Sequence, residues 1–537
     1  MVTTWWKHGI IYQVYPRSFL DTNGDGIGDL QGIIRSLDYL AWLGVDALWV
    51  SPIFPSPMAD FGYDISDYCS ISATFGQLAD FDRLVTEAHR RHVKVILDLV
   101  PNHTSDRHPW FVDSRSSRAS SKRDWYIWRD GQPDGPPNNW MSNFGGPAWE
   151  WDETTHQFYY HAFLKEQPDL NWRNPEVRMA MQAVMRFWLD RGVDGFRIDG
   201  LWHLIKDASF RDNPVNPGYG PGQPDINRFL QVHSADQPEI ADLVAELRAV
   251  VDAYADRVLI GEIYLPLQRL VAYYGKDLEG VHLPFNFQLL FTAWNAPALA
   301  SLIEEYERAL PVGAWPNWVL GNHDQKRVAT RVGNAQARIA AMLLLTLRGT
   351  PTLYYGDELG MTNVPIPPDA VQDSWEKNEP GLGLGRDPQR TPMQWSKSVH
   401  AGFTDQTPWL PVGANYRQCN VDEEKGDPAS MLILYRSLIA LRRRMPALAA
   451  GAYRTVPLGE NVLAYERVEG NQRLLIALNL DSDAKPVRLP SWAGTDVLLS
   501  TRTVKPASVS MPFVLHPDEG VVIGSETDVE QAIEGAS

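Results

Sequence analysis

The stretch VKVILDLVPNH (93–103) contains a mostly apolar, β-branched run that ends abruptly in polar residues. Such a run is typical of a strand that is buried on both faces of a parallel sheet. Working outward from it, seven further runs of the same kind occur: IIYQVYP (10–16), VDALWVS (45–51), VDGFRID (193–199), RVLIGEI (257–263), HLPFNF (282–287), NWVLGNHD (317–324) and PTLYYGDE (351–358). The sequence therefore predicts eight buried strands.

Helical patterns separate these runs, among them residues 30–44, 81–92, 177–192 and 335–349. Strand–helix alternation repeated eight times predicts an α/β fold, a (β/α)₈ TIM barrel. The last barrel helix is expected at 431–446.

Two long segments interrupt this alternation. Residues 101–171, after the third strand, are rich in Trp, Pro, Gly, Asn and Ser and are too long for a plain loop. A Pro/Gly-rich loop region, 361–428, follows the eighth strand, and from residue 451 short alternating runs predict an antiparallel β domain. We therefore expect barrel segments at 1–100 and 172–450, an inserted domain B at 101–171 and a C-terminal β domain at 451–537.

Composition narrows the class of protein. The chain has 537 residues, of which 44% are hydrophobic, and a formal net charge of −17. Such a charge disfavours a nucleic acid or an anionic membrane surface as a partner. No signal peptide and no stretch of about 20 apolar residues is visible, which predicts a cytoplasmic protein. A monomer or a homodimer is expected. The two cysteines, Cys69 and Cys419, exclude a disulfide scaffold, and two free thiols are favoured over one disulfide.

Polar residues gather where the predicted strands end, and in a barrel these ends face one mouth. They are Asp98, Asn102, His103, Arg197, Asp199, Glu262, Asn322, His323 and Asp324. A single acid there is typical of a salt bridge or a helix cap, but the set favours glycoside hydrolysis, in which two carboxylates act on the sugar. Arg197 is expected to keep Asp199 ionised, and the apolar residues before Glu262 are expected to raise its pKa.

The sequence resembles the α-amylase superfamily, glycoside hydrolase family 13. The motifs that carry the resemblance are DLVPNH (98–103), GFRID (195–199), GEI with Glu262, and NHD (322–324), in that order and each at a strand end. QPDLNW (167–172), FGYDISDY (61–68) and GRDPQRTPMQW (385–395) are similar to the bacterial α-glucosidase and oligo-1,6-glucosidase branch, which includes transglucosylating enzymes.

The resemblance implies a retaining mechanism in which Asp199 is the nucleophile, Glu262 the general acid/base and Asp324 the third acid, which binds and distorts the sugar. It also implies a set of substrate-binding residues: Asp60, Tyr63, His103, Arg197, Gly200, His323 and Arg386. Phe144 and Phe163 are expected either as pocket walls or as simple packing residues. No organic cofactor is expected.

The implied activity is that of an exo-acting α-glucosidase, with α-1,4-linked, maltose-like substrates and transfer of glucose to alcohol or sugar acceptors. A sucrose isomerase or an oligo-1,6-glucosidase is the alternative within the family. An endo-acting amylase is disfavoured because Asp60 and Arg386 match a pair that closes the pocket. A non-catalytic, transporter-associated relative is disfavoured because the acids are present and no membrane anchor is visible.

The chain departs from its relatives at Gly200, directly after Asp199. Relatives that favour α-1,6 links commonly carry Val there, and those that favour α-1,4 links carry a smaller residue or Thr. Gly200 is therefore expected to leave the most room beside subsite +1.

One further motif stands apart from the strand ends. In residues 21–29, DTNGDGIGD, oxygen-bearing residues alternate as they do in loops that wrap a hard cation. The loop is not an EF-hand, because Gly32 stands where its twelfth-position Glu would be. The resemblance implies a structural Ca²⁺ or Mg²⁺ held by Asp21, Asn23, Asp25, Ile27 and Asp29. The alternative is a metal-free loop of Asx turns.

Overall fold

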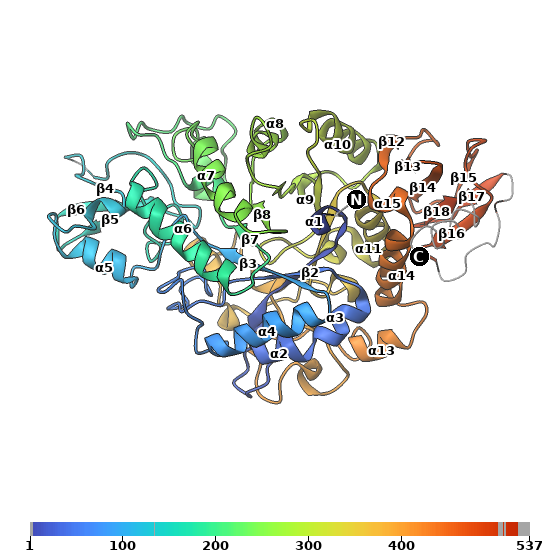
Figure 1. Cartoon of the computed structure of the whole chain (residues 1–537), viewed down its shortest axis with the longest axis horizontal. Coiled ribbons are helices and arrows are strands. Elements are labelled where there is room, and N and C mark those ends of the chain that lie inside the picture. The colour runs from blue at the N-terminus through green and yellow to red at the C-terminus, as the bar shows by residue number, and fades with distance from the viewer. Residues whose placement is uncertain (1–3, 134, 503–508, 510–511, 525–537) are drawn as a thin grey trace.

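The computed structural model describes residues 4–133, 135–502, 509 and 512–524. Its centre is an eight-stranded parallel sheet in the order β10-β11-β1-β2-β3-β7-β8-β9 (Figure 1). These strands are β1 (Ile11–Val14), β2 (Ala47–Val50), β3 (Lys94–Leu99), β7 (Gly195–Ile198), β8 (Val258–Gly261), β9 (Leu283–Pro284), β10 (Asn317–Val319) and β11 (Thr350–Tyr354). Seven of them lie inside the predicted runs and β11 begins one residue before its run, which confirms the TIM barrel.

The two ends of the strand order meet through side chains. Leu283 of β9 and Val319 of β10 belong to one buried apolar cluster together with Trp49 of β2, Ile96 of β3 and Ile260 of β8. Side chains from strands on opposite sides of the sheet are in contact only if the sheet curls round on itself. The barrel interior is thus a packed core, as in other barrels of this type.

Helices surround the sheet. The longer ones are α2 (Leu30–Arg35), α3 (Leu37–Leu43), α4 (Leu78–Arg90), α6 (Pro175–Asp190), α7 (Ile240–Asp252), α10 (Ala296–Ala309), α11 (Val328–Thr346) and α14 (Met431–Arg444). The short ones are α1 (Trp5–His8), α8 (Leu267–Leu270), α9 (Gln288–Phe291), α12 (Ser374–Asn378), α13 (Val421–Lys425) and α15 (Pro446–Ala449). The helix predicted over 30–44 is divided between α2 and α3 at Ser36. The one predicted from 335 begins at Val328 and is kinked at Gly333, whose φ is 79°.

Between β3 and β7 the chain leaves the barrel and forms a lobe, seen at the left of Figure 1. It contains α5 (Pro109–Ser116) and the antiparallel strands β4 (Trp128–Arg129), β5 (Trp149–Asp152) and β6 (Gln157–Tyr160), in the order β4-β6-β5. Its aromatic side chains pack on one another: Trp140, Trp149 and Tyr160 belong to one buried cluster. This lobe holds its shape mainly through ring contacts, because its strands are short.

The C-terminal strands form the antiparallel β region that was predicted. A five-stranded sheet has the order β12-β13-β14-β18-β16, and β15 pairs with β17. Their bounds are β12 (Ala452–Thr455), β13 (Val462–Glu469), β14 (Gln472–Asn479), β15 (Lys485–Val487), β16 (Asp496–Ser500), β17 (Phe513–Leu515) and β18 (Gly520–Gly524). The Tyr465 hydroxyl lies 2.6 Å from Thr346 Oγ1, and Arg467 donates to the Thr346 carbonyl, so polar contacts as well as apolar packing join this sheet to α11.

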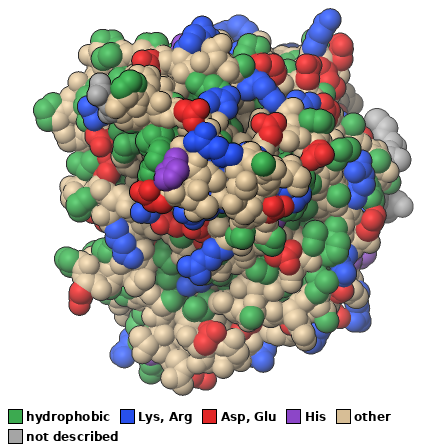
Figure 2. Space-filling view, turned by 90° about the vertical axis from the view of Figure 1, so that its left-hand side faces the viewer, with side chains coloured by type: hydrophobic (Ala, Val, Ile, Leu, Met, Phe, Trp, Pro, Cys, Tyr) green, Lys and Arg blue, Asp and Glu red, His purple; other side chains and the backbone are tan. Residues whose placement is uncertain are grey.

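Two other expectations concern the whole chain. Cys69 and Cys419 are both free thiols. Within the described ranges, no helix is long and apolar enough to cross a membrane. On the face shown in Figure 2, acidic and basic side chains are intermixed rather than gathered by sign.

Candidate active site

A cavity of about 250 Å³ lies where the predicted catalytic residues converge. Asp199 follows β7, Glu262 follows β8, and His323 and Asp324 lie just beyond β10, so all four are at the carboxyl ends of barrel strands. The cavity is lined by Asp60, Tyr63, His103, Asn143, Phe144, Phe163, Asp199, Trp202, Ile226, Glu262, Tyr264, His323, Asp324, Gln325, Trp375 and Arg386. Most of the sequence-predicted site residues are therefore brought together in one pocket.

Arg197 lies behind the carboxylates and connects them. Its Nη1 donates to Asp98 Oδ1 at 2.8 Å and to Asp199 Oδ1 at 2.7 Å, and its Nη2 lies 2.7 Å from Glu262 Oε1. The guanidinium is fully buried and lies 4.9 Å from the centre of the Trp49 ring. Three carboxyl groups thus share one cation, and Arg197 acts as their anchor rather than as part of the cavity wall.

Glu262 is held on its other side by the backbone. Its Oε2 accepts a hydrogen bond from the Gly200 N–H at 2.8 Å. Burial raises the pKa of Glu262 to about 7, although Arg197 acts to lower it. This is the direction predicted from the apolar residues that precede Glu262. A carboxyl group with such a pKa keeps a substantial protonated fraction near neutral pH and can act as a general acid.

Asp199 differs from the prediction that Arg197 would simply keep it ionised. Burial and the neighbouring Glu262 carboxylate raise its pKa above the ordinary value, while Arg197 lowers it. The reason is the charge count: Asp98, Asp199 and Glu262 surround a single guanidinium, so burial of three acids against one cation favours retention of a proton among them. The Arg197 contact predicted for Asp199 is nevertheless present.

Asp324 has the opposite electrostatic environment. Arg390 Nη2 lies 2.8 Å from its Oδ1, Arg386 Nη1 lies 3.5 Å from the same atom, and His323 is adjacent. These groups overcome burial and hold the pKa of Asp324 well below its usual range. The third acid is therefore the carboxylate that is most firmly ionised.

One end of the pocket is closed by ion pairs. Arg386 Nη2 lies 2.6 Å from Asp60 Oδ1 and 2.6 Å from Asp373 Oδ1, and its guanidinium lies 4.6 Å from the centre of the Phe144 ring. The predicted Asp60–Arg386 pair exists, with Asp373 as a further partner. Because the three charged groups are buried, this closure is a fixed part of the wall.

His103 forms the wall next to this closure. Its Nε2 lies 3.1 Å from the Tyr63 carbonyl oxygen and 3.1 Å from Gln167 Nε2, and burial lowers its pKa to about 4. The Phe163 ring lies 5.3 Å from the His103 ring and 5.6 Å from that of Phe144. Both phenylalanines line the cavity, so they are pocket walls as well as packing residues.

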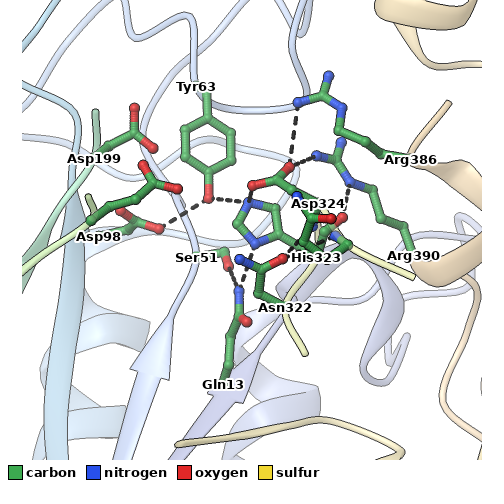
Figure 3. A network of polar contacts seen from close by, with 12 residues as sticks. Gln13, Ser51, Tyr63, Asp98, Asp199, Asn322, His323, Asp324, Arg386 and Arg390 are labelled. Atoms are coloured by element: carbon green, nitrogen blue, oxygen red, sulfur yellow. Dashed lines mark hydrogen bonds and ion pairs between the residues drawn. The ribbon is translucent and has the colours of Figure 1, made fainter. Parts of the chain in front are cut away.

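Tyr63 links two parts of the site (Figure 3). Its hydroxyl lies 3.0 Å from Asp98 Oδ2 and 2.6 Å from His323 Nε2, and its ring is stacked on the His323 ring at an interplanar angle of 4°. The anchored carboxylates and His323 therefore belong to one hydrogen-bonded network.

Gly200 is placed differently from the prediction. It is absent from the cavity lining, and its φ of 53° lies in the left-handed region. A Cβ at this position would lie 3.7 Å from Phe163 Cζ, which is ordinary contact. Space is therefore available there, but the contribution of Gly200 in this structure is the backbone N–H that holds Glu262.

Sequence reasoning missed several residues of the pocket: Asn143, Trp202, Ile226, Tyr264, Gln325 and Trp375. Tyr264 stands two residues after Glu262, beyond the end of β8 at Gly261, so strand alternation does not indicate it. Arg390 lies inside the quoted motif GRDPQRTPMQW. Asp373 and Trp375 belong to the short helix α12 and its N-cap inside the long segment after β11, and no sequence signal identifies them.

The loop 21–29 lies away from this cavity and is internally satisfied. The Asp21 carboxylate accepts from the N–H groups of Asn23, Gly24 and Gly26 and from the Thr404 hydroxyl. Asp29 accepts from Thr22 and caps α2 at Gly32. Across the part of the chain that the structure describes, no three His, Cys, Asp or Glu residues are grouped so as to hold a metal ion. In this structure the residues form Asx turns, and no reaction step involves the loop.

Comparisons with known proteins agree with the fold. Residues 13–451 match the family described as alpha amylase, catalytic domain. The chain is 43% identical to a probable alpha-glucosidase of Rhizobium meliloti, over 90% of this chain and 91% of that one. A solved alpha-glucosyl transfer enzyme is 41% identical, with a TM-score of 0.92 and coverage of 97% and 99%. A mutant isomaltulose synthase from Erwinia rhapontici, solved with its natural substrate sucrose, is 34% identical, with a TM-score of 0.89 and coverage of 97% and 99%.

These likenesses extend over nearly the whole length of both partners, and the matched family model spans every barrel strand except the first residues of β1. The carboxylates at the strand ends provide the chemical groups that glycoside cleavage requires. The chain therefore belongs to the α-amylase family, glycoside hydrolase family 13, and is a glycoside hydrolase.

Proposed function

We propose that the protein is a retaining, exo-acting α-glucosidase that cleaves α-1,4-linked glucose from the non-reducing end and also transfers it to alcohol or sugar acceptors. The observation that carries the proposal is the pairing of two features in one pocket. Asp199 and Glu262 are held on one guanidinium, and the pocket that they face is closed by Arg386 with Asp60 and Asp373.

The chemistry follows from the positions of the two acids. Protonated Glu262 gives its proton to the glycosidic oxygen, while the Asp199 carboxylate attacks the anomeric carbon and forms a covalent β-glucosyl-enzyme. While Glu262 keeps its proton, Arg197 neutralises the Asp199 carboxylate; once Asp199 is an ester, Arg197 neutralises the Glu262 carboxylate. Glu262, now a carboxylate, then removes a proton from water or from an acceptor hydroxyl, which releases glucose or a new α-glucoside.

The closed end supports exo action. A chain that continued beyond the glucose in the pocket would have to displace Arg386 from both Asp60 and Asp373. Breaking a buried ion pair by removing one partner is strongly destabilising. A single non-reducing glucose therefore fits this pocket better than the middle of a polysaccharide.

Transfer needs an acceptor to replace water at the glucosyl-enzyme. Trp202 and Tyr264 come from the segments that follow Asp199 and Glu262, their ring centres are 5.7 Å apart, and both line the cavity. Aromatic faces beside the acid/base can hold a sugar ring or an apolar alcohol. The rings of Trp202 and Tyr264 therefore favour binding of an acceptor at the place where water would otherwise react with the glucosyl-enzyme.

Sucrose isomerisation is the second candidate, favoured by the similarity to the isomaltulose synthase. Incubation with maltose, isomaltose and sucrose separates the candidates. Glucose and transfer products from maltose support the main proposal. Preference for isomaltose indicates an oligo-1,6-glucosidase, and conversion of sucrose to an isomer without loss of fructose indicates a sucrose isomerase.

The nucleophile assignment predicts where a covalent label is found. A 5-fluoro-glucosyl fluoride forms a slow glucosyl-enzyme, and we expect mass spectrometry of the digested protein to place it on Asp199. Asp199→Asn is expected to abolish turnover while leaving the fold intact. A label on Glu262 or Asp324 would overturn the assignment.

The pKa of Glu262 predicts the alkaline limb of the pH profile. A general acid must be protonated, so kcat/KM for maltose is expected to fall as pH rises through about 7. An activated substrate such as α-glucosyl fluoride needs little protonation, so its alkaline limb is expected to be weak. Glu262→Gln is expected to remove the maltose limb along with most of the activity. Added azide is expected to yield α-glucosyl azide from the activated substrate, because it displaces Asp199 from the β-glucosyl-enzyme with inversion. A β-azide, or the same limb for both substrates, would contradict the role.

Gly200 has a left-handed backbone, which limits the substitutions that can test its predicted role in linkage preference. Val is β-branched and is strongly disfavoured at such a φ, so Gly200→Val would harm all substrates alike. Gly200→Ala costs about 1–2 kcal/mol in backbone energy. This cost cancels when kcat/KM for maltose is divided by kcat/KM for isomaltose. We expect that ratio to fall by roughly ten-fold, because a methyl group narrows the aglycone side.

Gly470→Ala is the matched control, since Gly470 has a φ of 56° and nothing within 4 Å of an added Cβ. It should cost similar stability and leave the maltose-to-isomaltose ratio unchanged. An unchanged ratio in Gly200→Ala would mean that position 200 acts only through the Glu262 hydrogen bond.

A divalent ion in the loop 21–29 stays a separate proposal, based on its alternating oxygen-bearing residues. Adding Ca²⁺ or Mg²⁺ to chelator-treated protein is expected to raise the midpoint temperature of unfolding while the rate barely changes, because an ion bound only to the folded state stabilises it. Asp25→Ala, which leaves the Asp21 and Asp29 contacts in place, should abolish the rise. No response in the unaltered protein would establish a metal-free loop of Asx turns.

A further inference from the structure

Gln13 lies at the base of the site, on the opposite side of His323 from the cavity network (Figure 3). It is fully buried on β1, and its Nε2 lies 2.8 Å from His323 Nδ1 and 3.2 Å from Ser51 Oγ. Its Oε1 is buried and has no partner in the structure. A buried amide oxygen without a partner is costly, which raises the question of what this orientation of the side chain achieves.

The donors and acceptors of the network favour one arrangement of protons. Arg197 and the Trp49 indole can only donate, and they donate to Oδ1 and Oδ2 of Asp98 respectively. This makes Asp98 the carboxylate of the three acids, and the proton retained among them lies on Asp199 or Glu262.

Asp98 Oδ2 also accepts the Tyr63 hydroxyl proton. The Tyr63 oxygen, having given its only proton to Asp98, must accept from His323 Nε2, which lies 2.6 Å away. Nε2 therefore carries the proton.

In a neutral imidazole with a proton on Nε2, Nδ1 has a lone pair and needs a donor. The Gln13 amide NH₂ provides it, and this fixes the orientation that leaves Oε1 unpaired. If the amide were reversed, its oxygen would face the Nδ1 lone pair unless that nitrogen were protonated as well. In this orientation Gln13 leaves its own Oε1 without a partner, while Nδ1 of His323 receives a hydrogen bond.

The charges around His323 do not all favour the neutral ring. Asp324 Oδ2 lies 3.3 Å from Nε2 and favours the imidazolium, whereas burial and three arginines oppose it. The groups that face the ring or act on it are Tyr15, Trp49, Tyr63, Asp324, Arg197, Arg386 and Arg390. Gln13 contacts Nδ1 directly, and a donor placed there blocks the one position at which a second proton could be added.

We propose that Gln13 is a positioning residue that keeps His323 neutral, with its proton on Nε2, by donating an amide hydrogen to Nδ1. A glycosidase transition state resembles an oxocarbenium ion. A neutral His323 beside the cavity adds no positive charge against that developing charge, whereas an imidazolium would oppose it. The catalytic part of this inference rests on the proposed glucosidase function; the protonation state of His323 does not.

The first test measures that state directly. The experiment uses the full-length protein with ¹⁵N-labelled histidine, and the His323 ring signals are assigned by their loss in His323→Asn. We expect these signals to show a neutral ring protonated on Nε2 from about pH 5 to 8. The reason is that burial lowers the pKa of His323 well below its ordinary value. A ring protonated on Nδ1, or an imidazolium in this range, overturns the proposal whatever the enzyme's substrate.

The second test uses kcat/KM for α-glucosyl fluoride, which depends little on the proton of Glu262. Gln13→Glu replaces the donor with an acceptor of the same shape, so Nδ1 gains a proton. We expect kcat/KM to fall by at least about ten-fold and to fall further as pH rises through a new ionisation that the unaltered protein lacks. Gln13→Leu is expected to lower kcat/KM without any new ionisation.

Tyr12→Phe is the matched control: Tyr12 is buried on the same strand and loses one hydrogen bond, to Glu358, on the other face of the sheet. It should lower the unfolding temperature and leave the pH profile unchanged. If Gln13→Glu and Gln13→Leu lose activity equally with unchanged profiles, Gln13 only fills space and the proposal fails. If the Gln13 variants do not fold, the ¹⁵N measurement alone decides it.

Discussion

The buried guanidinium of Arg197 is the interaction on which the site depends. Arg197 stands on β7 directly opposite Asp98 of β3 and Ile260 of β8 in the parallel ladder. A shift of one residue in either register would turn its side chain from one face of the sheet to the other. Asp98, Asp199 and Glu262 would then be buried acids without a cation, which is a costly arrangement. The apolar barrel core, by fixing this register, therefore also fixes the geometry of the carboxylates.

The same anchor explains why the acids of one pocket behave differently. Glu262 shares Arg197 with two other carboxyl groups, so burial dominates and its pKa rises to about 7. Asp324 is contacted by Arg386 and Arg390 from the loop region after β11, and its pKa is held low. Asp199 competes with Glu262 for one guanidinium, and burial together with that neighbour raises its pKa although Arg197 acts to lower it. The division of roles thus comes from the number of cations within reach of each acid.

The sequence alone was enough to locate the residues whose positions follow from the barrel fold. Asp199, Glu262 and Asp324 were identifiable because a strand has a fixed end and all parallel strands end at one mouth. Asp373, Trp375 and Gln13 were not. The first two belong to α12 and its N-cap, a five-residue helix whose place in the long segment after β11 depends on tertiary packing. Gln13 lies within a strand predicted as apolar, and its function depends on which side of His323 it faces, a relation between β1 and β10 that no local pattern contains.

The closure of the pocket and its chemistry are electrostatically coupled. Arg386 bridges Asp60 and Asp373, which close the pocket, and also lies 3.5 Å from Asp324, the acid expected to bind the sugar. A substitution that opened the closed end by removing this guanidinium would also withdraw one of the charges that keep Asp324 ionised. An exo-acting pocket of this kind therefore cannot be converted to an open cleft by trimming one wall residue: the positive charge that Arg386 contributes to Asp324 must be replaced from another direction.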